Sequence, residues 1–223
     1  MKTWNRRQRT LCLLLLTALI LLAVTVSGAL LTNLATETDF AHTNLAPSLD
    51  RLFGTDWLGR DMLARTLAGL SLSIRIGALT ACVSAVIALA LGVAAALSRR
   101  ADAALSWLVD LFLGIPHILL VMLISLACGR GFWGVVAGVS LSHWPSLARL
   151  VRGEVLQLRQ APYLLAAEKL GVPRGQLVRR HLLPHLLPQF LTGLVLQFPH
   201  AILHEASVTF LGFGLSSEQP AIG

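Results

Sequence analysis

The chain has 223 residues, of which 55% are hydrophobic and only 13% are charged. Its mean hydropathy is +0.72, and several apolar runs approach the length of about 20 residues that crosses a bilayer. This composition excludes an ordinary soluble domain. The net charge of +7 does not indicate a nucleic-acid partner, because aromatic residues make up only 6% and the basic residues flank apolar runs. We therefore expect an all-α integral membrane protein embedded in a lipid bilayer.

Five apolar segments predict transmembrane helices, over residues 11–31, 71–97, 104–127, 132–150 and 185–205. Around them we expect a tail over 1–10, a polar segment over 32–70, a basic loop over 151–184 and a C-terminal segment over 206–223. The first run is long for the apolar part of a cleaved signal peptide, so an uncleaved helix is favoured. Five helices leave the two termini on opposite sides of the membrane, and we expect a sixth helix to be missing at the C-terminus.

Lysine and arginine are enriched in the cytoplasmic segments of membrane proteins. In this chain they concentrate in the tail, in the turn after the second predicted helix and in the loop 151–184. Among them are Lys2, Arg6, Arg7, Arg9, Arg99, Arg100, Arg174, Arg179 and Arg180. We therefore place the N-terminus and this loop in the cytoplasm, and the segments 32–70 and 206–223 outside.

The loop 151–184 carries strong local signals. Residues 161–170 have the spacing of an amphipathic helix, Gly171 is the residue type that commonly follows a helix, and Pro173 suits the start of another. We predict a short helix held between two breaks, then a second helix that enters the last span near Pro184. Taken alone, the pattern is equally compatible with an ordinary loop that is basic only because it faces the cytoplasm.

Two motifs in this loop resemble the cytoplasmic coupling loop of ABC importer permeases. They are AA-x3-G at Ala166, Ala167 and Gly171, and LLP at residues 182–184, although the family pattern begins with glutamate where this sequence has Leu165. Other segments resemble the peptide and nickel permeases of that family, in the expected order. They are FGTDWLGRDMLARTLAGLSLSIRIG, VDLFLGIPHILL, LSHWPSLARLVRGEVLQLRQAPYLLAAEKLG and AILHEASVTFLGFGL.

The resemblance implies a type I ABC importer permease bundle in the bacterial inner membrane. The implied partners are a second homologous permease, two ATP-binding subunits and an external substrate-binding protein. The sequence has no GxxxxGK[ST] motif to bind phosphates. We therefore expect ATP and Mg²⁺ on the partner subunits, and expect this chain to be no enzyme and to bind no cofactor of its own. The residues expected to couple it to the ATPase are Tyr163, Ala166, Ala167, Gly171, Arg174 and Pro184.

Histidines within the predicted spans bear on what is carried. His200 and His204 share one face of a helix, and imidazole is a good ligand for nickel. The HxxxH pair, LSHW and Leu165 resemble the nickel-importer permease more than the typical peptide permease. We expect nickel or a metal chelate as substrate, with His200 and His204 as transient metal ligands. The alternatives are import of dipeptides or oligopeptides, and histidines that only join helices.

Further residues complete the expected pathway, in which His117 and His143 also take part. Asp110 either lines the pathway or pairs with a nearby cation, and Pro116 is expected to kink its helix. Glu205 either attracts a cation or caps the turn that follows. His204 and Glu205 do not continue into the HExxH order of a metalloprotease, so a membrane metalloenzyme is not favoured.

The segment 32–70 contains a charged group with two interpretations. Asp56, Arg60 and Asp61 either contact the external binding protein or form an internal salt-bridged turn. Trp133 and Trp144 are expected to anchor the fourth predicted helix at the membrane interface.

Overall fold

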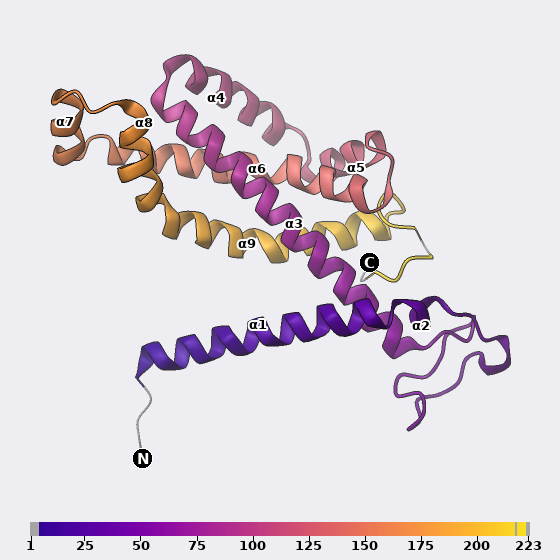
Figure 1. Ribbon diagram of the computed structural model, residues 1–223. Coiled ribbons are helices and arrows are strands. Elements are labelled where there is room, and N and C mark those ends of the chain that lie inside the picture. The colour runs from indigo at the N-terminus through magenta and orange to yellow at the C-terminus, as the bar shows by residue number, and fades with distance from the viewer. Residues whose placement is uncertain (1–4, 217, 222–223) are drawn as a thin grey trace. The chain divides into compact units, whose positions relative to one another are not determined.

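The computed structural model describes residues 5–216 and 218–221, and every regular element among them is helical (Figure 1). The predicted all-α class is confirmed. The elements are α1 (Arg6–Leu30), α2 (Thr32–Thr36), η1 (Phe40–His42), α3 (Met62–Leu97), α4 (Arg99–Gly114), α5 (His117–Ala127), α6 (Gly131–Leu158), α7 (Pro162–Lys169), α8 (Arg174–Leu177), η2 (Val178–Leu182) and α9 (Leu183–Phe210). Residues 1–4 of the predicted tail, Lys2 included, and residues 217 and 222–223 of the predicted C-terminal segment lie outside the described residues.

The chain forms two compact units, one up to Ile76 with the segment from Leu215, the other Gly77–Gly214. Among the described helices, α1, α3 and the run Arg174–Phe210 are each long and apolar enough to cross a membrane. The pair α4 and α5 makes a fourth candidate if it is one bent span. The predicted helix 132–150 corresponds to α6. This helix is not among the candidate spans, because residues 142–146, Ser-His-Trp-Pro-Ser, make it less apolar than α1, α3 and α9.

The predicted single helix over 104–127 is wrong. Two helices, α4 and α5, occupy this stretch and meet at 98° across Ile115 and Pro116. Proline has no N–H to donate and disfavours the helical conformation of the residue before it. Ile115 is accordingly extended, with ψ 135°. The expected proline kink is therefore present, but as a complete break.

Three other predicted boundaries move. Helix α3 begins at Met62 rather than near 71, α6 continues beyond 150 to Leu158, and α9 ends at Phe210 rather than near 205. Segments that look like loops by hydropathy thus belong to helices. A polar helical turn that leaves the bilayer loses none of its hydrogen bonds, so hydropathy alone predicts helices that are too short.

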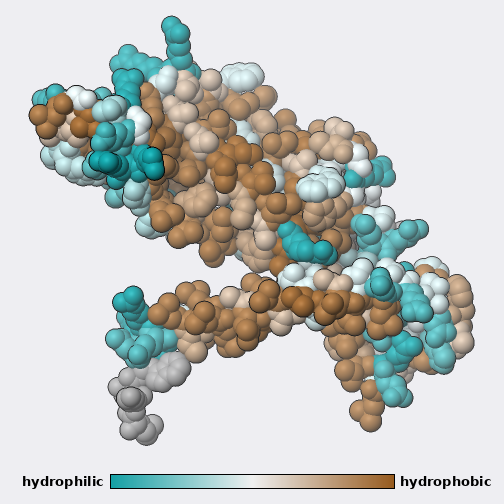
Figure 2. Space-filling view, in the orientation of Figure 1, coloured by the Kyte–Doolittle hydropathy of each residue, from teal (hydrophilic) through white to brown (hydrophobic). Residues whose placement is uncertain are grey.

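In the first unit, the C-terminal part of α1 packs on α3. A Cβ on Gly28 would lie 2.0 Å from the carbonyl oxygen of Leu67, and the Ser71 hydroxyl donates to the carbonyl of Thr25 at 2.8 Å. Elsewhere α1 exposes leucines such as Leu15 and Leu19, and Figure 2 shows apolar residues along its length with hydrophilic ones at its N-terminal end. This is the surface of a helix suited to lipid.

In the second unit, α6 is the central helix. Small residues let α5 approach it closely: a Cβ on Gly134 would lie 2.8 Å from the carbonyl oxygen of Ser125, and one on Gly138 2.7 Å from that of Val121. Trp144 is only 3% exposed and packs edge to face on Phe112, with ring centroids 5.4 Å apart. The prediction that Trp144 anchors the interface is wrong, because its ring fills the core between α6 and α4.

We expect Gly138→Ala to destabilise the second unit and Gly153→Ala to leave it unchanged or slightly more stable. Both changes raise helix propensity by about 1 kcal/mol. A Cβ at 138 would meet a backbone carbonyl, whereas a Cβ at 153 would have nothing within 4 Å. Overpacking of this kind costs about 1–3 kcal/mol. Thermal unfolding of the two variants in the same detergent measures the difference, and equal midpoints would contradict the close approach.

Candidate functional site

The connection between α6 and α9 is a compact hairpin built on local signals. Pro162 begins α7, where its missing N–H costs nothing. At the other end Gly171 has φ +79°, and the N–H groups of Gly171 and Val172 donate back to the carbonyls of Glu168 and Ala167. This pair of bonds is a Schellman motif, which closes a helix with a residue in the left-handed region. The predicted short helix, its glycine end and the restart after Pro173 are all present.

Helix α9 is entered through a π-helical turn, η2 (Val178–Leu182). The turn ends two residues before Pro184, which has no N–H for the α-helical ladder, and the N–H of the intervening Leu183 donates to the carbonyl of Val178, five residues back. Because of this adjustment the helical run continues without interruption from Arg174 to Phe210. The predicted coupling residues thus lie on two adjoining elements: Tyr163, Ala166, Ala167, Gly171 and Arg174 on the hairpin, and Pro184 at the start of α9.

One face of α7 is fixed and the other is open. Leu164 is buried in the core of the second unit and lines a small cavity with Leu177 and Leu182. On the opposite side Tyr163 is 52% exposed and Leu170 is 84% exposed. A short helix with a buried anchor and an exposed apolar face is an arrangement that a protein partner can hold.

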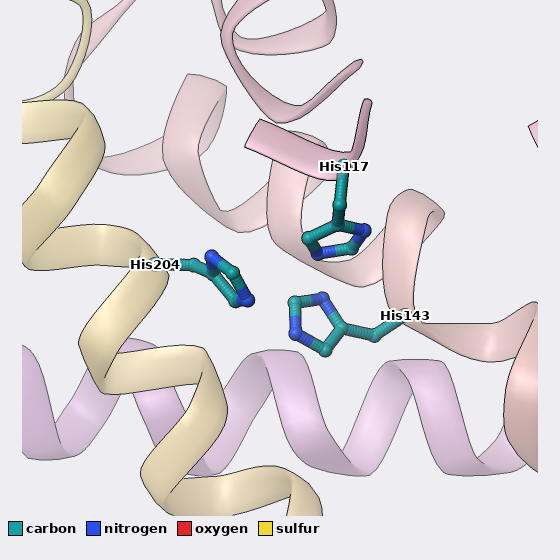
Figure 3. Close-up of side chains that lie close together, drawn as sticks. All are labelled: His117, His143 and His204. Atoms are coloured by element: carbon teal, nitrogen blue, oxygen red, sulfur yellow. The ribbon is translucent and has the colours of Figure 1, made fainter. Parts of the chain in front are cut away.

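Three histidines from different helices converge in the second unit (Figure 3). His117 begins α5, His143 lies midway along α6, and His204 lies on α9. Their ring centroids are 4.6 Å apart for His117 and His143, 4.5 Å for His117 and His204, and 5.0 Å for His143 and His204. One nitrogen from each ring lies within 4.8 Å of the others.

His200 does not belong to this cluster, although the sequence pairs it with His204. It is exposed on α9, and the group of side chains able to share an ion consists of His117, His143 and His204. The spacing of His200 and His204 shows that they share one face of a helix, but not that they face the same neighbouring side chains. The contact that the sequence could not provide is that of His117, which depends on the break at Pro116.

The other predicted pathway residues have partners of their own. Asp110 pairs with Arg149 at 3.3 Å, both side chains being exposed, which agrees with the expected pairing to a cation. Glu205 is fully buried and accepts a hydrogen bond from the Thr209 hydroxyl at 3.1 Å. The sequence gives no signal for a stronger contact nearby, in which Arg152 donates two hydrogen bonds to the carboxylate of Asp102 on α4.

In the first unit, Asp56 organises the charged turn before α3. Its carboxylate pairs with Arg60 at 2.8 Å and accepts the backbone N–H groups of Leu58 and Arg60. Burial raises the pKa of Asp56, but the hydrogen bonds from Arg60 and Leu58 outweigh it and hold the pKa below its ordinary value. Asp61 pairs with Arg51 and caps α3 by accepting the Ala64 N–H. These contacts form the internal salt-bridged turn that was one of the two interpretations.

Comparison with known proteins identifies the family. Residues 87–223 match the family described as "Binding-protein-dependent transport system inner membrane component". The chain is 33% identical to the dipeptide transport system permease protein DppC of Bacillus subtilis over 78% of its length, and 31% identical to the oligopeptide transport system permease protein OppC of the same organism over 91%. It is 39% identical over 75% of its length to a putative peptide transport system permease protein of Brucella suis.

The chain therefore belongs to the family of binding-protein-dependent transport system inner membrane components. It spans 55% of the dipeptide permease, 68% of the oligopeptide permease and 57% of the Brucella protein. All three relatives are named for peptide transport, so the expected closeness to nickel permeases is not supported.

The lowered pKa of Asp56 predicts an acid-sensitive turn. A carboxylate with a depressed native pKa contributes stability above its unfolded pKa, and that contribution is lost as pH falls through the native pKa. We expect amide hydrogen exchange over residues 56–61, corrected for the intrinsic exchange rate, to accelerate as the pH falls below the unfolded pKa of Asp56 and through its native pKa. Asp56→Asn should accelerate exchange at neutral pH by about ten- to a hundredfold, since hydrogen bonds to charged groups contribute about 1.5–3 kcal/mol. Asp50→Asn, at an exposed position, is the control and should change neither the exchange rate at neutral pH nor its dependence on pH. If Asp56→Asn exchanges like the unmodified chain, the ion pair is not what protects the turn.

Proposed function

We propose that this chain is a transmembrane permease subunit of an ATP-driven ABC importer in the bacterial inner membrane. It would act with a second homologous permease, two ATP-binding subunits and an external substrate-binding protein. The observation that carries the proposal is the α7 hairpin, a short helix with an exposed apolar face, held between α6 and α9. It lies inside the part of the chain that matches the inner-membrane component family.

The hairpin is built to transmit displacement rather than absorb it. Only residues 159–161 separate α6 from α7, and Arg159 donates to the carbonyl of Ala96, the penultimate residue of α3, through its Nη1 at 2.6 Å. Leu164 is buried beneath α7, and the run from Arg174 to Phe210 is helical throughout. A partner that moves α7 therefore moves the ends of α6 and α9 with it. This is the coupling that ATP-driven transport requires, with ATP and Mg²⁺ held by the partner subunits.

As substrate we propose dipeptides or oligopeptides, the second of the two expected classes. The names of the three relatives support this choice. Nickel or a metal chelate has less support, since none of these relatives is named for it.

Reconstitution tests the substrate. The complete complex of both permeases, the ATPases and the binding protein is placed in proteoliposomes, and uptake of a labelled dipeptide, a labelled oligopeptide and ⁶³Ni²⁺ is measured with and without ATP. We expect ATP-dependent accumulation of peptide. Accumulation of nickel without peptide would contradict the proposed substrate but agree with the proposed importer function. No ATP-dependent uptake of any of the three would contradict the importer function itself.

A charge on α7 should uncouple the complex. Ala166 is exposed on α7, so Ala166→Glu changes chain stability by no more than about 0.5 kcal/mol, yet it places a carboxylate in the proposed docking face. We expect substrate-stimulated ATP hydrolysis to fall at least tenfold. Gln176→Glu adds a charge at an exposed position of α8 and should retain activity. If both variants hydrolyse ATP like the unmodified complex, α7 is not the docking element.

A further inference from the structure

We propose that His117, His143 and His204 form a binding site for one divalent transition-metal ion, with a position left open for a further ligand. The three imidazoles come from α5, α6 and α9, so an ion held by them joins three helices of the second unit. The proposal concerns metal binding by this chain and stands independently of what the importer carries.

The first argument is distance. One nitrogen from each ring lies within 4.8 Å of the others, and Figure 3 shows the three rings facing a common space. A tetrahedral ion with metal–nitrogen distances of about 2.0–2.1 Å needs its donor nitrogens about 3.3 Å apart. We expect rotation of the His117 and His204 side chains about their χ angles to bring the three nitrogens to this spacing.

The second argument is the orientation of His143. Its Nδ1 lies 2.8 Å from the carbonyl oxygen of Val139, which can only accept, so Nδ1 carries the proton. In the neutral ring Nε2 then carries no proton, and its lone pair is free to bind a metal ion. Metal-binding histidines commonly donate their other N–H to a backbone carbonyl in this way, because the bond fixes both tautomer and ring position.

The third argument is an unsatisfied atom. Nε2 of His117 is buried and has no hydrogen-bond partner among the described residues. Nor does any hydrogen bond among those residues join two of the three rings; they meet edge to face. Buried polar atoms are nearly always paired. If the three rings were joined by hydrogen bonds to one another, Nε2 of His117 would have a partner. It has none among the described residues, and is therefore able to bind a ligand.

The donor set selects the ion. Three imidazoles suit Zn²⁺, Ni²⁺, Cu²⁺ and Co²⁺, whereas Mg²⁺ and Ca²⁺ prefer oxygen. The nearest carboxylate along the chain, Glu205, is not part of the group and accepts a bond from Thr209. Three neutral ligands leave the charge of the ion uncompensated, so the open position is suited to an anionic ligand or to hydroxide.

The test uses the full chain, without a polyhistidine tag, purified in detergent and stripped with chelator. Zn²⁺ binding is measured by titration calorimetry, and we expect one ion per chain. His117→Ala, His143→Ala and His204→Ala should each weaken binding at least tenfold. His200→Ala, an exposed histidine one turn from His204 and outside the cluster, is the matched control and should bind like the unmodified chain.

A second measurement does not depend on variants that must fold. X-ray absorption of the Zn²⁺ or Co²⁺ form counts the imidazoles on the ion, and we expect three in a four-coordinate site, with the intense visible Co²⁺ bands of that geometry. Thermal unfolding without metal separates loss of ligand from loss of fold in the variants. An oxygen-only shell, absence of stoichiometric binding, or equal loss of affinity in His200→Ala would overturn the proposal.

Discussion

The second unit depends on one backbone constraint, the break between α4 and α5. Proline at 116 cannot donate an N–H and holds Ile115 in an extended conformation, so the chain turns by 98° instead of continuing as a helix. As a result α5 runs along α6, where Gly134 and Gly138 allow its backbone to approach. The same turn makes His117 the first residue of α5. A continuous helix would give neither the close packing nor the histidine cluster.

Helix α6 carries what the other elements need. Its glycines receive α5, Trp144 fills the space toward α4, and Leu147 contacts Gly193 of α9, on which a Cβ would lie 2.6 Å from a Leu147 methyl group. Because helices cover so much of it, α6 has little need of an apolar surface for lipid. This explains how it tolerates Ser142, His143 and Pro145 at its centre. Polar side chains enclosed by other helices face partners rather than hydrocarbon.

Local signals made the hairpin predictable. Pro162, Gly171 and Pro173 each act within a few residues of the chain, so the sequence defines where α7 begins and ends. Hydropathy also locates α1, α3 and α9 approximately, but it does not show the break within residues 104–127. Contacts between helices did not follow. Trp144 was expected at an interface and lies in the core, and His200 was paired with His204 by periodicity alone. Which face of a helix meets which neighbour is fixed by packing, and packing here follows from a turn whose angle the sequence does not specify.

The hairpin and the histidine cluster share two helices, which has a mechanical consequence. Helices α6 and α9 hold α7 between their ends, and they also carry His143 and His204. Between the two sites, the Gln197 amide of α9 donates to the carbonyl of His143 at 3.3 Å, and Leu186 and Leu147 both belong to the buried core of the second unit. These contacts give a continuous path of packed side chains along which a change in spacing between α6 and α9 could pass from one site to the other. Coupling of this kind would be reciprocal: if a ligand drew the two histidines together and so favoured one position of α7, a partner that fixed α7 would favour the matching spacing of the histidines.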